Sequence, residues 1–141
     1  MKKEIDIWNI LHDGEITAVE KGKNGLYTIF VNIPYLRRRI SPLGDSFVLT
    51  LSGVKQITFQ DFGGTMSMLE DELEISTPEI LQTESEAMPI YIATTAGTLI
   101  LHYENIDLKL DTGQPVTFET IETVCRDYWG ELRKRTKNNQ R

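Results

Sequence analysis

The sequence has no lysine or arginine between Lys55 and Lys109. The same stretch holds ten carboxylates, so the centre of the chain is a block of uncompensated negative charge within a net charge of −6. General binding to nucleic acid depends on lysine and arginine side chains that neutralise phosphates. This block, together with a pI of about 4.9, therefore argues against a nucleic-acid-binding protein.

The sequence is also poor in the residues that build disulfides, metal sites and membrane spans. A single cysteine, Cys125, excludes an internal disulfide and agrees with a reducing compartment. Two histidines, His12 and His102, cannot supply the usual zinc ligands. No window approaches the roughly 20 apolar residues of a membrane span, and acids interrupt the apolar region that a signal peptide needs. We expect a cytoplasmic protein with no metal, no cofactor and no membrane partner.

The residues that are present suffice for one folded domain, because 40% of them are hydrophobic and 9% are aromatic. We predict a single domain over residues 1–141, with a frayed tail at 136–141. Apolar residues at helical spacing predict a short helix over 4–12, ending at Asp13-Gly14. A long C-terminal helix is predicted after the N-cap Thr117, because an apolar stripe recurs at spacings of three and four: Phe118, Ile121, Cys125, Tyr128 and Leu132.

Alternating apolar residues predict strands between these helices. Asn24-Gly25 is typical of a two-residue type I′ turn, so the flanking segments should form a hairpin in which Ile16 faces Ile33. Two more strands are predicted over 45–51 and 54–59. Residues 65–88 show no clean period, which favours a loop with an irregular strand.

After Pro89 the alternation becomes regular. The pattern predicts an antiparallel meander of three strands (90–95, 98–103 and 106–111) with turns at Ala96-Gly97 and Glu104-Asn105. In that register Leu101 faces both Ile92 and Leu108, and His102 lies opposite Asp107.

Strands joined by hairpins, without crossover helices, indicate an α+β fold. We predict a curved antiparallel sheet or small barrel of about seven strands. The short N-terminal helix and the long C-terminal helix should pack on it.

Few residues suggest catalysis. His12 beside Asp13 is typical of a helix terminus, and Cys125 on an apolar stripe is typical of a core. His102 with Asp107 would still need a nucleophile. Asp61-Phe62-Gly63 matches the metal-binding tripeptide of protein kinases, but the other kinase motifs are missing. The sequence favours a protein that is not an enzyme and names no catalytic residue.

The charge pattern favours a non-catalytic protein-interaction module whose acidic centre binds a basic partner. Small acidic proteins such as immunity proteins and other inhibitors bind basic nucleases, an analogy of class and not of motif. The run at 70–74 lacks the alternating ligands and the glycine of a calcium loop. The candidate partner-binding residues are Asp61, Glu70, Asp71, Glu72, Glu74 and Glu79.

Three alternatives stay open. Arg37, Arg38 and Arg39 form a basic patch for an anionic ligand, or else pair with the acidic middle of the chain. A small molecule would bind in a pocket lined by aromatic residues: Trp8, Tyr27, Tyr91, Tyr103 and Trp129. A homo-oligomer would form if the C-terminal helix left a half-apolar sheet face uncovered, namely the face with Tyr91, Ala93, Ile100, His102, Asp107 and Lys109.

Overall fold

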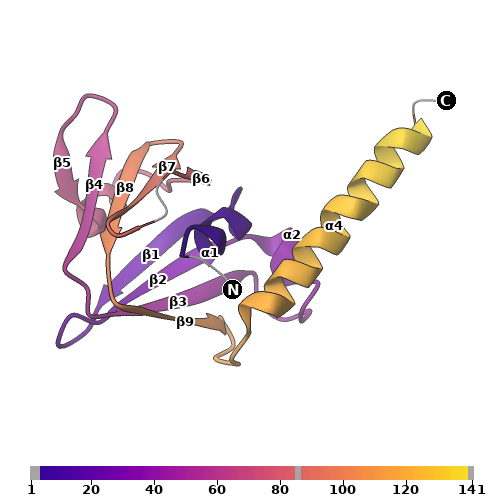
Figure 1. Cartoon of the computed structure of the whole chain (residues 1–141), viewed down its shortest axis with the longest axis horizontal. Helices are drawn as coiled ribbons and strands as arrows, with labels where there is room; N and C mark the ends of the chain where they lie inside the picture. Colours follow the sequence, from indigo (N-terminus) through magenta and orange to yellow (C-terminus); the bar gives the residue numbers. More distant parts are fainter. Residues whose placement is uncertain (1–3, 85–86, 140–141) are drawn as a thin grey trace.

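The computed structural model describes residues 4–84 and 87–139, which form an α+β fold of two antiparallel sheets (Figure 1). One sheet has the order β1 (Glu15–Lys21), β2 (Tyr27–Asn32), β3 (Ser46–Ser52), β9 (Asn105–Leu110). The other has the order β5 (Met66–Met68), β4 (Gln56–Asp61), β8 (Gly97–His102), β7 (Ile90–Thr94), β6 (Ile80–Thr83). The helices are α1 (Glu4–Ile10), α2 (Pro34–Arg37), α3 (Leu69–Glu72) and α4 (Phe118–Asn139). The α+β class is confirmed, whereas one curved sheet or barrel of about seven strands is wrong.

The two sheets share a long, bent pair of strands. β4 pairs with β8 through Gln56 and His102, and beyond the bend β3 pairs with β9 through Ser52 and Asn105. Backbone hydrogen bonds continue the pairing across the bend. In one of them the Glu104 N–H donates to the Ser52 carbonyl at 2.9 Å. Strands that pass from one sheet to the next in this way form the corners of packed β-sheets.

This bend overturns the predicted meander. The first hairpin, β7–β8, is present, but β9 continues past Glu104-Asn105 and pairs with β3 instead of turning back on β8. Leu108 therefore faces Leu49 and not Leu101. A strand that turns back and a strand that crosses into a second sheet keep the same alternation, so the pattern alone did not separate them.

The β1–β2 and β7–β8 hairpins exist, each in a shifted register. Asn24 and Gly25 have positive φ values of 55° and 73°, as a primed turn requires. The loop is longer than two residues, however, because the Gly22 N–H donates to the Leu26 carbonyl at 2.7 Å. With a bulge after Ile16, that residue faces Val31 and not Ile33.

In the second hairpin, Ile92 faces Leu99 and not Leu101. The turn is at Thr95-Ala96, one residue earlier than predicted, which shifts each partner by two residues. The Thr94 hydroxyl donates to the Gly97 carbonyl at 2.8 Å. A shift of two leaves the same side chains on the inner face.

The segment 65–88, predicted as a loop with an irregular strand, contains two short strands and a helical turn in its described part. α3 contacts β4, β5 and β1 and buries Leu69 in the core. The chain then pairs with the start of β1, where the Ile80 N–H donates to the Gly14 carbonyl at 2.8 Å. A register shift in β6 explains why no clean period was visible.

The core lies between the inner faces of the two sheets and is closed by α1. Trp8 of α1 is fully buried and donates from Nε1 to the Tyr103 hydroxyl at 3.1 Å. Tyr27 is also buried. Three of the five aromatic residues suggested for a ligand pocket are therefore core residues.

α4 begins as predicted, since the Thr120 N–H donates to the Thr117 hydroxyl at 3.1 Å. Phe118 and Ile121 are buried, and the helix packs against α1 and α2. It then projects away from the body instead of lying across a sheet (Figure 1). The expected packing on the sheet is wrong, because an apolar stripe does not specify which surface it covers. The helix reaches Asn139, and residues 140–141 of the predicted frayed tail lie outside the described residues.

Candidate functional site

The stretch without lysine and arginine corresponds to one part of the structure. All strands of the five-stranded sheet, and α3, lie between Lys55 and Lys109. All 15 lysine and arginine residues of the chain lie outside this interval, in the segments that include the other sheet, α2 and α4. The charge asymmetry of the sequence is therefore an asymmetry between two halves of the molecule.

The side of this sheet that faces away from the core carries neutral side chains. The strand pairing shows which residues lie on this side of the sheet. Met68 faces Thr58, Thr58 faces Ile100, and Ile100 faces Tyr91. Met66, Gln60 and Thr98 form a parallel row with Ala93. We call this surface the outer face, and it consists of Gln56, Thr58, Gln60, Met66, Met68, Tyr91, Ala93, Thr98, Ile100 and His102.

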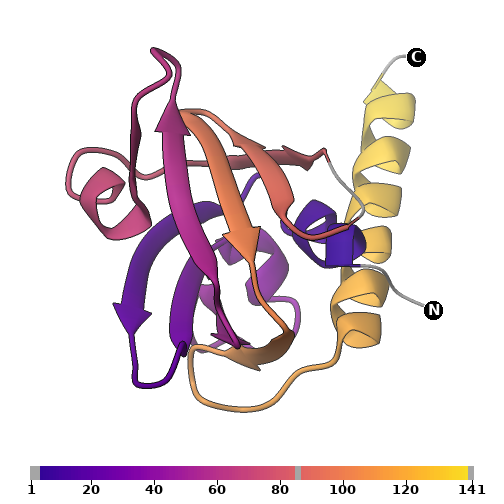
Figure 2. The ribbon, with the colours of Figure 1, turned by 60° about the vertical axis from the view of Figure 1, so that its left-hand side comes forward.

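The outer face is uncovered in the described part of the chain. Figure 2 shows the five-stranded sheet with no helix across its outward side. Exposed fractions are 49% for Met66, 38% for Met68 and 41% for Tyr91. A hollow of about 200 Å³ opens at one end, beside Thr58 and Met68, and the exposed Lys55, directly before β4, also lines it. Sequence reasoning missed both methionines, although the alternation Met66-Ser67-Met68 was a signal for a strand with one apolar side.

Four exposed carboxylates lie in segments next to the strands of this face. Asp71 and Glu74 lie on or just after α3, and Glu104 lies at the bend between β8 and β9. Glu84 follows β6 and its N–H donates to the Tyr91 carbonyl at 2.8 Å. We call these four residues the acidic rim. Neutral, partly apolar side chains inside a charged border resemble the composition of a protein-protein interface.

The structure brings only some of the predicted partner-binding carboxylates together. Glu70, Asp71 and Glu74 share the α3 region, with Glu70 half-buried. Glu72 is only 7% exposed, and its Oε2 accepts a hydrogen bond of 2.9 Å from the Ser76 hydroxyl. Because it is turned inward, Glu72 has a structural position within α3.

Asp61 and Glu79 lie elsewhere. Asp61 Oδ1 accepts hydrogen bonds of 2.9 Å from the N–H groups of Gly63 and Thr65, which closes the β4–β5 turn. Phe62, at the tip of that turn, is 80% exposed. Glu79 is half-buried where the backbone bridges to Glu15 of β1.

The three consecutive arginines do not form a common patch. Arg37 is fully buried and donates to Asp111 Oδ1 at 2.7 Å and to the Leu43 carbonyl at 2.6 Å. Arg39 pairs with Glu131 of α4, and its guanidinium lies 5.1 Å from the centre of the Tyr128 ring. Both acidic partners lie outside the acidic middle of the chain, so the predicted pairing with that segment is also wrong for these two arginines.

The histidines and the cysteine form no catalytic constellation. His102 lies opposite Gln56, whereas Asp107 lies opposite Thr50 in the other sheet. The His12 ring stacks on Trp129, with centroids 5.5 Å apart. Burial raises the pKa of the Cys125 thiol, and the nearby Trp129 side chain only partly opposes this effect. The thiol is thus protonated at neutral pH and is a poor nucleophile.

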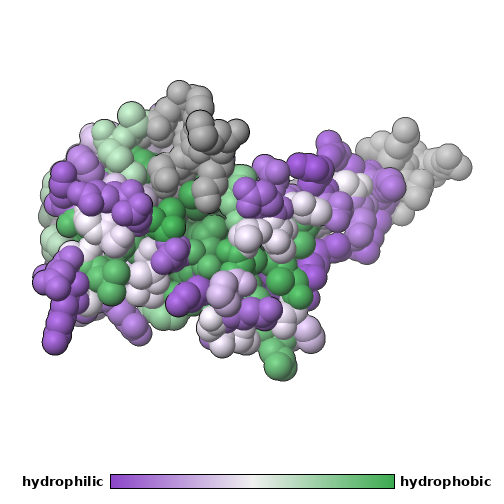
Figure 3. All heavy atoms as spheres, turned by 60° about the horizontal axis from the view of Figure 1, so that its bottom comes forward, coloured by the Kyte–Doolittle hydropathy of each residue, from purple (hydrophilic) through white to green (hydrophobic). Residues whose placement is uncertain are grey.

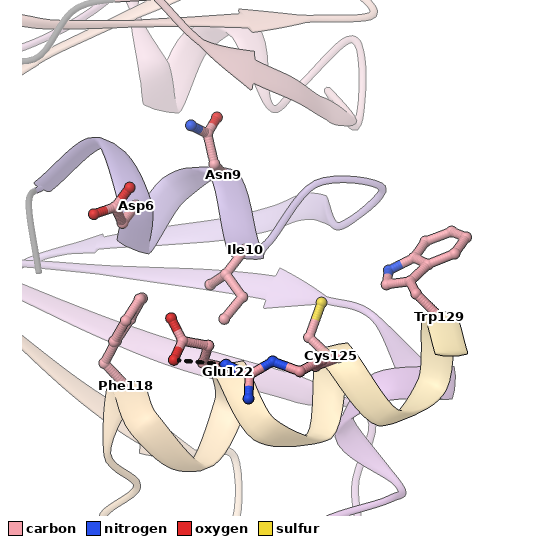
Figure 4. A pocket seen from close by; sticks show the side chains of 8 residues that line it. Asp6, Asn9, Ile10, Phe118, Glu122, Cys125 and Trp129 are labelled. Atoms are coloured by element: carbon pink, nitrogen blue, oxygen red, sulfur yellow. Dashed lines mark hydrogen bonds and ion pairs between the residues drawn. The ribbon is translucent and has the colours of Figure 1, made fainter. Parts of the chain in front are cut away.

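A second hollow, of about 350 Å³, lies between α1 and α4. Figure 4 shows Ile10 pointing from α1 toward α4 and Cys125 pointing back toward α1. Trp129 closes one end of the hollow, and the exposed Glu122 and Arg126 form an ion pair at 3.3 Å on its border. This open groove has an apolar floor and mixed charge at its edge.

Comparisons with protein-family models, with curated proteins and with solved structures found no significant match for the chain. Among the described residues, no helix combines the length and the apolar character needed to cross a bilayer. Within the same residues, no three acidic, histidine or cysteine side chains lie together as metal ligands would.

Proposed function

We propose that this chain is a non-catalytic protein-interaction module that binds a basic partner through the outer face and the acidic rim. The observation that supports this most is the uncovered five-stranded sheet, which contains no lysine or arginine and exposes Met66, Met68 and Tyr91. Exposed apolar patches bordered by polar residues mark interaction sites in soluble proteins.

The two parts of this surface contribute differently to binding. The acidic rim attracts a positively charged partner and raises the association rate, an effect that salt screens. The partner buries apolar surface of Met66, Met68 and Tyr91 away from water, and this burial slows dissociation. Unbranched methionine side chains also adapt to partners of different shape.

The alternative of a symmetric homo-oligomer through the outer face is less favourable. Two copies would place acidic rim against acidic rim, and the strands of the five-stranded sheet carry no lysine or arginine to compensate; the nearest cation is the exposed Lys55, directly before β4. Like charges brought together across an interface cost several kcal/mol. The surface therefore fits a partner of opposite charge.

The acidic rim is tested by affinity capture from cell lysate. We expect a basic protein to be captured at low salt and released at high salt by the wild type, and to be lost with the double variant Asp71→Lys, Glu74→Lys. Glu72 is left unchanged because it is buried. The matched control is Glu119→Lys with Asp127→Lys, which makes the same charge change at exposed positions of α4. Equal capture by all three proteins would contradict the proposal.

The outer face is tested with an apolar-to-lysine pair. Met68→Lys should strongly reduce capture, because it places a charge on an apolar part of the outer face that the partner would otherwise remove from water. Leu43→Lys changes an apolar side chain that is 70% exposed in the loop before β3, and it should leave capture unchanged. If both variants bind as the wild type does, the outer face is not the binding surface.

A further inference from the structure

The free end of α4 has the charge that the five-stranded sheet lacks. A helix of 22 residues is about 33 Å long at 1.5 Å per residue. Its buried residues, Phe118 and Ile121, are in the first turn or just after it. Arg133, Lys134 and Arg135 are exposed near the far end. On the face that Figure 3 presents, the coloured part of this projecting half is mostly hydrophilic.

We propose that the free end of α4 docks on the outer face of a second copy of this chain. This inference rests on the proposed function, because the outer face and the acidic rim form the receiving surface. The guanidinium and ammonium groups of Arg133, Lys134 and Arg135 pair with carboxylates of the rim, including Asp71 and Glu74.

The two surfaces do not meet within one chain. α4 is anchored at its start against α1 and α2, and it projects away from the five-stranded sheet (Figure 1). The contact therefore joins the α4 end of one copy to the outer face of another. The first copy still has its own outer face free, and the second still has its own α4 end free. Such head-to-tail contacts grow into open chains unless the rotation closes a ring.

Electrostatics sets the strength of this association. The attraction between the basic helix end and the acidic rim acts over about one Debye length, which is about 10 Å at 0.1 M salt and 3 Å at 1 M. Every copy carries a net charge of −6, which opposes close approach of whole molecules. The self-association is accordingly weak and sensitive to salt, and a basic partner competes with it for the same sheet.

Sedimentation equilibrium with two complementary variants tests the proposal. The helix variant carries Arg133→Glu, Lys134→Glu and Arg135→Glu, and the sheet variant carries Asp71→Lys and Glu74→Lys. The wild type should show a mass that rises with protein concentration at low salt and returns to the monomer in about 1 M salt. Each variant alone should associate on the order of tenfold more weakly.

A mixture of the two variants separates head-to-tail contact from other modes. The helix variant keeps an intact sheet, the sheet variant keeps an intact helix, and the reversed helix end and reversed sheet are also opposite in charge. A 1:1 mixture should therefore form heterodimers and recover the association that each variant alone has lost. Circular dichroism of each variant checks that it is folded. A wild type that stays monomeric at low salt, or a mixture that forms no heterodimer, overturns the proposal.

Failure here is distinguishable from failure of the proposed function. If the wild type is monomeric but the sheet variant still loses the captured basic partner, only self-association is refuted. If neither self-association nor partner capture depends on Asp71 and Glu74, both proposals fail.

Discussion

Arg37 is a buried cation that connects segments distant in the sequence. Its guanidinium donates to Asp111 after β9, to the Ser46 carbonyl at the start of β3, and to the carbonyls of Ser41 and Leu43 in the preceding loop. A planar fork of five donors suits this arrangement, which a lysine ammonium does not reproduce. The residue that the sequence offered as part of a basic surface patch therefore stabilises the four-stranded sheet.

Replacing Arg37 should destabilise the fold. Arg37→Ala leaves Asp111 without its ion-pair partner and removes the guanidinium donor from the Ser41 and Leu43 carbonyls, whereas the Ser46 carbonyl still accepts from the Asp111 N–H. We expect a loss of about 3 kcal/mol in the free energy of unfolding. Urea denaturation measures this change. The control Arg38→Ala removes a neighbouring exposed arginine and should change stability by less than about 0.5 kcal/mol. Similar losses for both variants would show that Arg37 is not a structural cation.

Asp111 predicts a dependence on pH. Burial alone raises the pKa of this carboxyl, but hydrogen bonds from the Asp45 and Ser46 N–H groups and from Arg37 outweigh burial and lower the pKa. A lowered pKa in the folded state means that the stabilisation is present above the ordinary value of about 3.9 and is lost as the pH falls through the lowered value. Asp111→Asn should therefore cost stability at pH 7, and this cost should shrink below about pH 4. A cost that stays constant across this range would contradict the assignment.

At the scale of elements, two glycines should respond in opposite ways to alanine. Gly130 lies inside α4 with no atom near the position of an added Cβ, so Gly130→Ala should stabilise the protein by about 0.5 to 1 kcal/mol. Gly97 has a φ of 149°, and an added Cβ would lie 2.3 Å from the Gln60 carbonyl oxygen. Gly97→Ala should cost more than about 1 kcal/mol. Thermal unfolding measures both, and a change of the same sign in both would refute these packing assignments.

The elements also show how far the sequence predicts this fold. Most strands and both longer helices follow from alternation, from helical spacing and from the Thr117 cap, which are local properties. The partner of β9 does not, because the choice between β8 and β3 depends on a bend at Glu104 that resembles a turn in the sequence. The short segments β5, α3 and β6 lack a clean period, since a bulge and a single helical turn interrupt it.

At the scale of the whole molecule, the charge pattern of the sequence corresponds to a structural division. The stretch without lysine or arginine predicted a charged region, and the structure locates that region in one sheet and α3. Which carboxylates face solvent was not predictable, because Glu72 differs from Asp71 and Glu74 only in the direction it takes from a short helix. The outer face could not be predicted either, since the sequence does not show that α4 leaves this sheet uncovered.

The most direct test of the interaction surface uses methyl NMR of the methionines. Met66 and Met68 lie on the outer face, whereas Met88 packs against the core. When the captured basic partner is added to protein labelled at its methionine methyl groups, the signals of Met66 and Met68 should shift and that of Met88 should not. Unchanged Met66 and Met68 signals at saturating partner would contradict the assignment of the outer face as the binding surface.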